Sequence, residues 1–135
     1  MWRKVLTLGL GLALSIVIPT TYCWSDCSQS DSGGTWRFYA VAASDGWYVY
    51  GSLQVQPNGV IVSGTTFKYT NGTSRTVRGG QLYLNSACIL YGHIHLSGGI
   101  TVNVKHGALE TDKSCFYGVW KDSNYNAGMA TGVKK

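Results

Sequence analysis

The chain has 135 residues, is rich in glycine with 18, contains only two prolines and carries a formal net charge of +5. Two of its 11 Lys and Arg residues lie at positions 3 and 4, so nine remain to face six Asp and Glu residues over the rest of the chain. These charges are scattered, which excludes the clustered basic surface typical of nucleic-acid binding. Without a leader, the length suits one domain.

The first 25 residues predict a signal peptide. Arg3 and Lys4 precede an uncharged apolar run at residues 5–18, which ends at Pro19. That run is long enough for the core of a secretory signal but falls short of the roughly 20 residues that a membrane span needs. We expect cleavage after Ser25 or slightly earlier, a secreted or periplasmic protein, and no membrane span in the mature chain.

The mature chain is predicted to consist of a flexible segment at residues 26–33 and one all-β domain at residues 34–135. No stretch has convincing helical periodicity, and turn residues separate eight extended runs. Every connection is short enough to join antiparallel neighbours and too short for a crossover. The runs lie near residues 35–43, 47–56, 60–70, 73–85, 88–97, 100–110, 113–121 and 125–134.

Cross-strand pairing predicts one apolar face, because residues opposite each other on an antiparallel ladder share a face. A three-residue loop at residues 97–99 places Leu96 opposite Ile100, whereas a two-residue loop would pair apolar with polar side chains. The predicted pairs on this face also include Trp36 with Leu53, Phe38 with Gly51, Ala40 with Val49, Leu82 with Leu90, Leu84 with Cys88, Ile94 with Val102, Gly92 with Val104 and Leu90 with His106.

Eight antiparallel strands with one apolar face predict an up-and-down meander that closes into a small barrel, since closure hides the face and removes exposed edges. A bulge at Gly107 would reverse the seventh strand, so two inward sets stay open. They are Phe116, Gly118 and Trp120, or Cys115, Tyr117 and Val119. The outer face is too polar for a membrane-spanning barrel. Its polar residues include Gln54, Gln56, His93, His95, Asn103 and Lys105.

A loose repeat accompanies these strands. It is anchored at Gly51, Gly80 and Gly107, each the first residue of a Gly-x-Leu unit. Eight residues after these glycines lie Gly59, Cys88 and Cys115. The unit therefore predicts alternate hairpins whose turns share one rim of the barrel.

Cysteines in an exported chain predict a disulfide rather than a thiol nucleophile or a metal cluster. Cys88 with Cys115 is the preferred bridge, because the repeat makes the two equivalent and only one strand separates them. Cys27 would then pair with Cys23 if cleavage retains that residue. A bridge from Cys27 to either rim cysteine stays open, and the Cα separation decides it.

Aromatic residues supply two candidate binding sites. Four inward side chains either line a pocket for a small apolar ligand or simply fill the barrel. They are Trp36, Phe38, Trp47 and Trp120. Four outward residues over the first hairpin form a patch that suits a protein or carbohydrate partner. They are Arg37, Tyr39, Tyr48 and Tyr50.

No metal site, catalytic site or cofactor is predicted. His93 and His95 share one face of a strand, but the register places His106 on the other face, so the three imidazoles do not converge. Ser, His and Asp occur without a local nucleophile signature, so we expect the protein not to be an enzyme. Residues 71–73, Asn-Gly-Thr, have the form of a glycosylation acceptor, but a type I′ turn is the preferred interpretation.

Two resemblances accompany these residues. Gly34-Thr35-Trp36, at the start of the first strand, resembles the Gly-x-Trp opening of the lipocalin and avidin superfamily of calycin-type barrels. Residues 37–41, Arg-Phe-Tyr-Ala-Val, replace the polar biotin-binding residues of avidins, so biotin binding is not expected. Residues 34–135 also resemble uncharacterised bacterial secreted β-proteins, which begin with Gly-Thr-Trp-Arg-Phe-Tyr and end like residues 132–135, Gly-Val-Lys-Lys. That second likeness implies no function.

Two functions from different classes are therefore expected. The first is a secreted, non-enzymatic barrel that binds a small apolar ligand in its interior. The second is an extracellular module for a protein or carbohydrate partner, including a barrel-type protease inhibitor whose inhibitory part would be residues 26–33. An open barrel interior would favour the first function, and inhibition of secreted proteases would favour the last.

Overall fold

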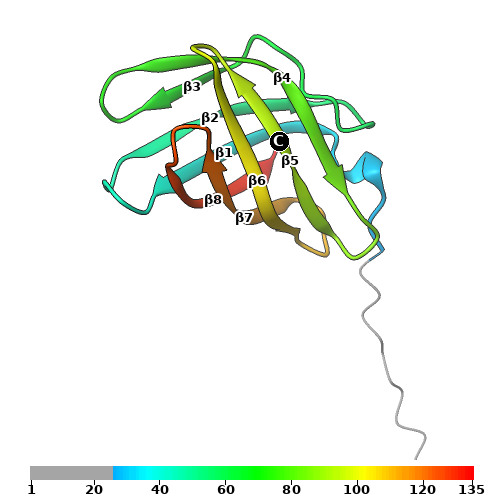
Figure 1. Ribbon diagram of the computed structural model, residues 1–135. Coiled ribbons are helices and arrows are strands. Elements are labelled where there is room, and N and C mark those ends of the chain that lie inside the picture. Colours follow the sequence, from blue (N-terminus) through cyan, green and yellow to red (C-terminus); the bar gives the residue numbers. More distant parts are fainter. Residues whose placement is uncertain (1–25) are drawn as a thin grey trace, which may run out of the picture.

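The computed structural model describes residues 26–135, and the predicted signal peptide with its cleavage site lies outside the described residues. Eight antiparallel strands follow one another around a closed barrel, which confirms the predicted up-and-down meander (Figure 1). None of the helical structure within residues 26–135 is long and apolar enough to cross a membrane. A short 3-10 helix, η1 (Gln29–Ser32), precedes the strands, which are β1 (Gly34–Ala42), β2 (Tyr48–Val55), β3 (Thr66–Tyr69), β4 (Ser74–Leu84), β5 (Ile89–Leu96), β6 (Ile100–Leu109), β7 (Cys115–Asp122) and β8 (Ala127–Lys134).

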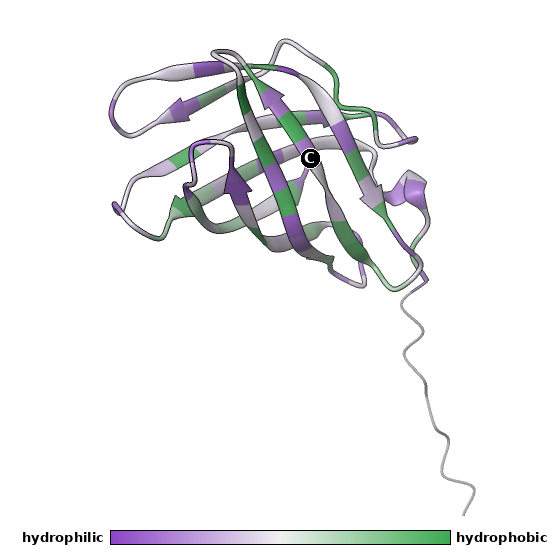
Figure 2. Ribbon diagram, in the orientation of Figure 1, coloured by the Kyte–Doolittle hydropathy of each residue, from purple (hydrophilic) through white to green (hydrophobic). Residues whose placement is uncertain are grey.

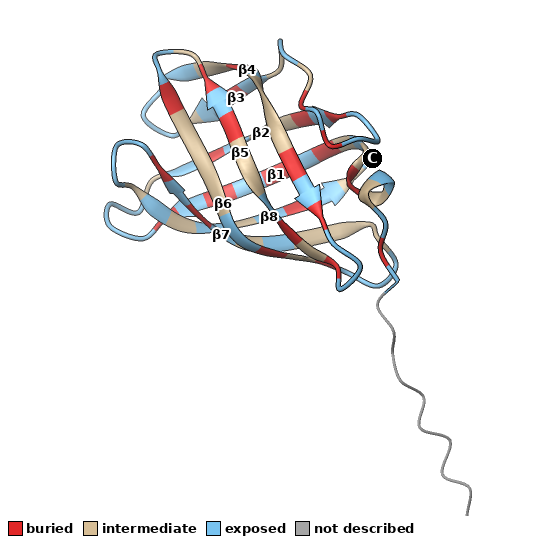
Figure 3. Ribbon diagram, turned by 45° about the vertical axis from the view of Figure 1, so that its right-hand side comes forward, coloured by how far each residue is buried: buried red, intermediate tan, exposed pale blue. Residues whose placement is uncertain are grey.

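Alternation along the strands places the core inside the barrel. In β1, Trp36 and Phe38 are buried while Arg37 and Tyr39 are exposed. Apolar and polar residues likewise alternate along the ribbon in Figure 2, and buried and exposed residues alternate in Figure 3. Successive side chains of a strand point to opposite faces, so the inner face of the closed sheet collects the apolar residues. That inner face is the core.

The predicted register is confirmed throughout the first hairpin and, in the β5–β6 hairpin, from the loop as far as Gly92 opposite Val104. Trp36 lies opposite Leu53, and Phe38 lies opposite Gly51. The three-residue loop at residues 97–99 sets Leu96 opposite Ile100. In these hairpins the pairing of apolar with apolar residues was sufficient to predict the register, because a slip by one residue would have exposed apolar side chains to solvent.

The predicted register between β4 and β5 was wrong by two residues. Leu84 lies opposite Leu90, not Cys88, and Leu82 lies opposite Gly92, not Leu90. The cause is a three-residue loop at residues 86–88 whose last residue, Cys88, has a positive φ of 62°. The N–H of Cys88 donates to the carbonyl of Asn85 at 3.0 Å, which closes the turn. A slip of two residues leaves every side chain on its face, so the apolar pattern could not detect it.

A bulge in β6 explains two further differences. Leu90 lies opposite Gly107 rather than His106, because β6 carries one extra residue between Val104 and Gly107. His106 is consequently exposed and not part of the core. The same bulge decides the orientation of β7, since Trp120 is buried while Tyr117 and Val119 are exposed. The set containing Phe116 and Trp120 therefore faces the interior.

β3 is shorter than the predicted run at residues 60–70. Only Thr66–Tyr69 form the strand, and residues 60 and 61 contribute isolated bridges to Gln81 and Val55, respectively. β2 and β3 pair over three residues, from Val49 to Gly51. Beyond that point, Thr65 joins β4 instead, because its carbonyl accepts from the N–H of Val77 at 2.8 Å. β3 is therefore the most weakly paired strand of the barrel, with three residue pairs to β2 and three to β4.

The repeated turn position is occupied by residues in the left-handed conformation. Gly59 and Cys88 both have positive φ values, of 85° and 62°, and each closes a three-residue loop. Gly72 has a φ of 85° in the same position, while Asn71 has no positive φ, so the predicted type I′ turn is wrong. Cys115 does not share this position, because it lies in β7.

Candidate ligand-binding cavity

A row in which large and small inward residues alternate from strand to strand runs around the middle of the barrel. Cross-strand partners in this row are Phe116, Gly132, Phe38, Gly51 and Phe67, taken from β7 through β8, β1 and β2 to β3. A Cβ at Gly132 would collide with the ring of Phe116, and one at Gly51 would lie 2.6 Å from the carbonyl oxygen of Thr66. Glycine in the row thus makes room for the neighbouring rings, and Phe38 and Phe67 approach to 4.3 Å between ring centroids.

The next row consists of small residues and leaves space. Gly118, Ala130, Ala40 and Val49 are cross-strand partners on β7, β8, β1 and β2. A cavity of about 80 Å³ lies within the barrel. Its lining is almost entirely apolar and consists of Ser32, Trp36, Phe38, Ala40, Trp47, Val49, Leu53, Phe67, Tyr69, Leu82, Leu90, Ile94, Val102, Val104, Leu109, Phe116, Trp120, Asp122 and Ala130. The barrel is therefore not completely filled by its own side chains.

One end of the cavity is bounded by an aromatic cluster, which we call the mouth and define as Trp47, Tyr69 and Trp120. The ring centroid of Trp47 lies 5.5 Å from that of Tyr69 and 5.9 Å from that of Trp120. The rings come from β3, β7 and the loop before β2. Trp47 and Tyr69 are half-buried, so part of each ring is in contact with solvent. The indole N–H of Trp120 donates to the carbonyl of Met129 at 3.2 Å, which fixes that ring to β8.

The polar groups near the mouth are already bonded within the protein. The buried Asp122 carboxylate accepts from the backbone N–H groups of Asn124 and Asn126 at 2.9 and 2.8 Å, so it closes the β7–β8 loop. Burial raises the pKa of the Tyr69 phenol above its ordinary value of 10.0. The positive charge of Arg75 opposes this rise, and the negative charge of Asp122 adds to it. At neutral pH Tyr69 is therefore uncharged, as an apolar site requires.

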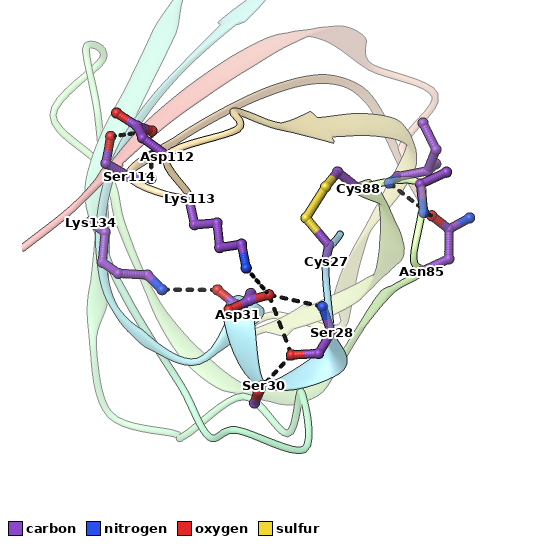
Figure 4. Close-up of a disulfide and its surroundings, with 12 residues drawn as sticks. Cys27, Ser28, Ser30, Asp31, Asn85, Cys88, Asp112, Lys113, Ser114 and Lys134 are labelled. Carbon is purple, nitrogen blue, oxygen red and sulfur yellow. Dashed lines mark hydrogen bonds and ion pairs between the residues drawn. A yellow bond between two sulfur atoms is a disulfide. The ribbon is translucent and has the colours of Figure 1, made fainter. Parts of the chain in front are cut away.

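The opposite end of the barrel is closed by residues 26–33, which we call the N-terminal segment (Figure 4). A disulfide joins Cys27 to Cys88 with the Cα atoms 5.2 Å apart. The preferred bridge of Cys88 with Cys115, and the pairing of Cys27 with Cys23, were therefore wrong. The β6 bulge turns Phe116 inward, which leaves Cys115 on the outer face and away from the buried Cys88. Cys115 has no disulfide partner within residues 26–135.

Gln29 ties the N-terminal segment to β4. Its side-chain Nε2 donates to the carbonyl of Leu82 at 3.1 Å, and its Oε1 accepts from the N–H of Leu84 at 3.0 Å. The amide group thus pairs with β4 as another strand would. On the cavity side, the indole N–H of Trp36 donates to the carbonyl of Ser32 at 2.8 Å. The segment was expected to be flexible; instead it forms the floor of the cavity.

Asp31 holds the other side of the segment. Its carboxylate accepts from the backbone N–H of Ser28 at 2.8 Å and lies 3.0 Å from Nζ of Lys113. Nζ of Lys134 donates to the Asp31 carbonyl at 2.8 Å, so two lysines converge on one residue, as Figure 4 shows. The hydrogen bond from Ser28 lowers the pKa of Asp31 below its ordinary value, and Lys113 lowers it further. These contacts fix both flanks of the floor to the barrel.

The structure brings all four predicted ligand-binding residues to one cavity. Trp36 lies at its floor, Phe38 in its middle, and Trp47 and Trp120 at its mouth. Sequence reasoning missed Tyr69, which completes the mouth, and the small residues Ala40 and Ala130 that create the space. The sequence predicted Phe38 opposite Gly51, but the continuation of this alternation through Gly132 and Phe116 was visible only once the register of β7 and β8 was known.

The predicted outer patch lies on the outer face of β1 and β2, where Arg37, Tyr39, Tyr48 and Tyr50 are all exposed. His93 and His95 lie side by side with ring centroids 4.9 Å apart. Within the described residues, no group of three His, Cys, Asp or Glu side chains is placed to hold a metal ion.

Comparisons with known proteins show the fold and not a family. No protein family model and no curated protein matches the chain. A de novo designed fluorescence-activating β-barrel aligns with a TM-score of 0.63 and 17% identity over 76% of this chain and 93% of its own. The redesigned β-barrel mFAP1 bound to DFHBI aligns with a TM-score of 0.66 and 16% identity over 79% of this chain and 100% of its own. The chain therefore has the eight-stranded antiparallel barrel fold of these designed proteins.

Proposed function

We propose that this protein binds a small apolar molecule inside its barrel and acts by binding rather than by catalysis. The observation that carries the proposal is an apolar cavity of about 80 Å³ with a bonded floor and an aromatic mouth. A single water needs about 10–15 Å³ of such space, so the volume exceeds one water several-fold. A site that is mostly apolar and enclosed is the usual setting for a small ligand.

The chemistry of the lining favours an apolar ligand, preferably a planar one. The Ser32 hydroxyl donates to the carbonyl of Gln29 at 2.7 Å, and the Asp122 carboxylate is occupied by its own loop. These groups are thus not free to recognise a polar ligand. Trp47, Trp120 and Phe116 offer aromatic faces and edges, which pack well against another ring. We expect the ligand to enter past the mouth, since the floor is cross-linked.

The cysteines indicate the compartment in which the protein would act. The Cys27–Cys88 disulfide is typical of an oxidising environment. Together with the predicted signal peptide, it supports a secreted or periplasmic binding protein. The inhibitor alternative is less favoured, because it needs a mobile segment at residues 26–33 and that segment is bound to the barrel end.

Likeness to designed barrels supports the proposal at the level of fold. The redesigned barrel mFAP1 has been solved bound to DFHBI, and its whole length aligns with this chain. A barrel of this strand number and size is therefore able to hold a small molecule. The identity of 16% transfers no residue of that site to this chain.

The test is to fill the cavity from one strand and compare the neighbouring outward position. Ala130→Leu adds bulk at the small row, whereas Thr131→Leu adds the same side chain on the outer face. Binding of indole and naphthalene is measured by ligand-observed NMR and by quenching of tryptophan fluorescence. We expect saturable binding to the parent, affinity at least about tenfold weaker in Ala130→Leu, and no change in Thr131→Leu.

Two results would contradict the proposal. One is the absence of saturable binding by either probe to the parent protein. The other is equal binding by parent and Ala130→Leu, which would place the probes outside the barrel. Circular dichroism of both variants establishes that a lost signal comes from the filled cavity and not from unfolding.

A further inference from the structure

A second concave site lies on the outside of the barrel, where β2 and β3 separate. It is a groove of about 480 Å³, and of its lining residues only Phe38 also lines the barrel cavity. β2 and β3 stop pairing after Gly51, and Thr65 then turns to bond β4, so the surface is hollowed between them. Six residues give the groove its chemistry, and they are Arg37, Tyr39, Tyr50, Ser52, Thr65 and Lys68.

The groove has an aromatic platform along one side. Tyr39 and Tyr50 are cross-strand partners whose rings stack with centroids 6.1 Å apart and an angle of 26° between their planes. They remain 53% and 40% exposed, so their outer faces are free. A flat, exposed pair of rings binds the apolar C–H face of a sugar ring well, while each hydroxyl reaches water.

Two cations flank this platform. Lys68 lies directly opposite Tyr50 on β3, and Arg37 lies on β1 two residues before Tyr39. Neither forms an ion pair within residues 26–135, and no carboxylate lines the groove. Unneutralised Arg and Lys around a concave surface attract an anionic group, and Arg binds carboxylate or sulfate through two parallel hydrogen bonds.

Thr65 adds an unpaired hydroxyl to the wall of the groove. Its Oγ1 is buried and is the sole buried side-chain oxygen or nitrogen among the described residues without a hydrogen-bond partner. A buried hydroxyl that stays unpaired is unfavourable, so an unpaired one in a groove wall points to a ligand that pairs with it. Ser52 contributes a second hydroxyl.

We propose that this groove binds an anionic saccharide, with a sugar ring on Tyr39 and Tyr50 and its carboxylate or sulfate between Arg37 and Lys68. A second copy of this chain is a poorer occupant. An isologous contact through this face would bring the unneutralised cations of two copies together, and like charges in an interface are unfavourable. The four residues proposed to contact the saccharide do not line the barrel cavity, so each proposal is tested separately from the other.

The test uses three probes of equal length: a heparin-derived oligosaccharide, an oligogalacturonate and a neutral maltooligosaccharide. Isothermal titration calorimetry is expected to show binding of at least one anionic probe at least about tenfold tighter than the neutral one. Tyr50→Ala and Lys68→Gln should each weaken that binding by about tenfold. Raising the salt concentration should weaken it in the parent and less so in Lys68→Gln.

A matched control exists on the other side of the barrel. Tyr83 and Tyr91 form a similar stacked pair, with centroids 5.3 Å apart and exposures of 42% and 45%, and neither lines the groove. Tyr83→Ala should leave saccharide binding unchanged. Thr65→Val should weaken binding while leaving the protein as stable as the parent or more so, because it removes an unpaired hydroxyl.

Four outcomes would overturn the proposal. They are no binding of any probe, equal affinity for neutral and anionic probes, equal loss in Tyr83→Ala and Tyr50→Ala, or a parent dimer in sedimentation experiments that Tyr50→Ala dissociates. The last would assign the surface to a contact between copies. Tenfold losses confined to Tyr50→Ala, Lys68→Gln and Thr65→Val would support the proposal.

Discussion

The two ends of the barrel are closed by different kinds of interaction. At the floor, the N-terminal segment is fixed by a disulfide, an ion pair and hydrogen bonds to β4 and Trp36. At the mouth, Trp47 contacts Tyr69 and Trp120 through their rings, and the indole N–H of Trp120 donates to the Met129 carbonyl. Directional and covalent links resist displacement, whereas aromatic contacts can be exchanged for similar contacts with a ligand. The comparison indicates a barrel that is permanently closed by the N-terminal segment at one end and closed at the mouth by contacts that a ligand can replace.

The largest expected effect comes from truncating a tryptophan at each end. Trp36→Ala should reduce the free energy of unfolding by about 3–5 kcal/mol, because it opens a cavity beneath a buried ring and leaves the Ser32 carbonyl unpaired. Trp47→Ala should cost only about 1–2 kcal/mol, since that ring is half-buried. Urea denaturation followed by circular dichroism measures both. Equal losses at the two ends would remove the distinction.

Removal of the disulfide tests the covalent part of the floor. The bridge closes a loop with a sequence separation of 61 residues. Its loss in Cys27→Ser, Cys88→Ser should lower the free energy of unfolding by about 2–4 kcal/mol, mainly by freeing the unfolded chain. Cys115→Ser should change stability little, because Cys115 forms no disulfide within the described chain. A double variant as stable as the parent would show that the hydrogen bonds alone hold the floor.

A substitution at Gly132 tests the aromatic row that lies between the two ends. Gly132→Ala places a Cβ against the ring of Phe116, so we expect a loss of about 1–3 kcal/mol. Thr131→Ser on the outer face is the control, because it keeps the hydroxyl that donates to the Phe116 carbonyl, and it should stay within about 0.5 kcal/mol of the parent. If Gly132→Ala were as stable as the parent, the Phe116 ring would have another position available, and the row would not be a fixed layer.

The smallest expected effect is a difference in the response of the two ends to pH. The pKa of Tyr69 at the mouth is raised, so its contribution is fully present below pH 10.0 and is lost as the pH rises through the folded-state pKa. The pKa of Asp31 at the floor is lowered, so its contribution is present above pH 3.8 and is lost as the pH falls through the folded-state pKa. Thermal unfolding across pH should therefore show Tyr69→Phe flattening the alkaline limb and Asp31→Asn the acid limb.

Exposed residues provide the controls for the pH comparison. Tyr48→Phe is the matched substitution for Tyr69→Phe, because Tyr48 is exposed on the outer face. Asp45→Asn is the matched substitution for Asp31→Asn, since Asp45 is exposed in the β1–β2 loop. An alkaline limb that Tyr48→Phe alters as much as Tyr69→Phe would contradict the assignment of that limb to the mouth.

The eight strands and most of the inward face could be predicted from the sequence, because alternation with period two is a strong local signal. The pairing of Trp36 with Leu53 followed from it directly. The β4–β5 register did not, since a two-residue slip keeps Leu84 inside and so leaves the pattern unchanged. Its cause, Cys88 in the left-handed conformation, is uncommon for a residue other than glycine and carries no sequence signature.

The tryptophans of the candidate site could be predicted from the sequence, but the cavity between them could not. Period-two alternation and cross-strand pairing predict Trp36, Phe38 and Trp47 in the interior and place Trp120 in one of two open sets, and all four line the cavity. The β6 bulge decided whether Phe116 or Cys115 faced inward, and with it the disulfide. A bulge inserts one extra residue into a strand. Its position depends on packing against both neighbouring strands, so the sequence of a single strand does not reveal it.

The ladder between β1 and β8 has a consequence for the order of folding. Seven of the eight strand pairings join strands that follow one another in the chain, and the remaining pairing, which includes Phe38 with Gly132, joins the first strand to the last. Local hairpins form with little loss of chain entropy, whereas contacts between distant parts of a chain are slow. We therefore expect the sheet to assemble as an open ribbon and to close at β1–β8 in the last and slowest step. Until then the interior face, with all its aromatic residues, is exposed to other unfolded copies of the chain.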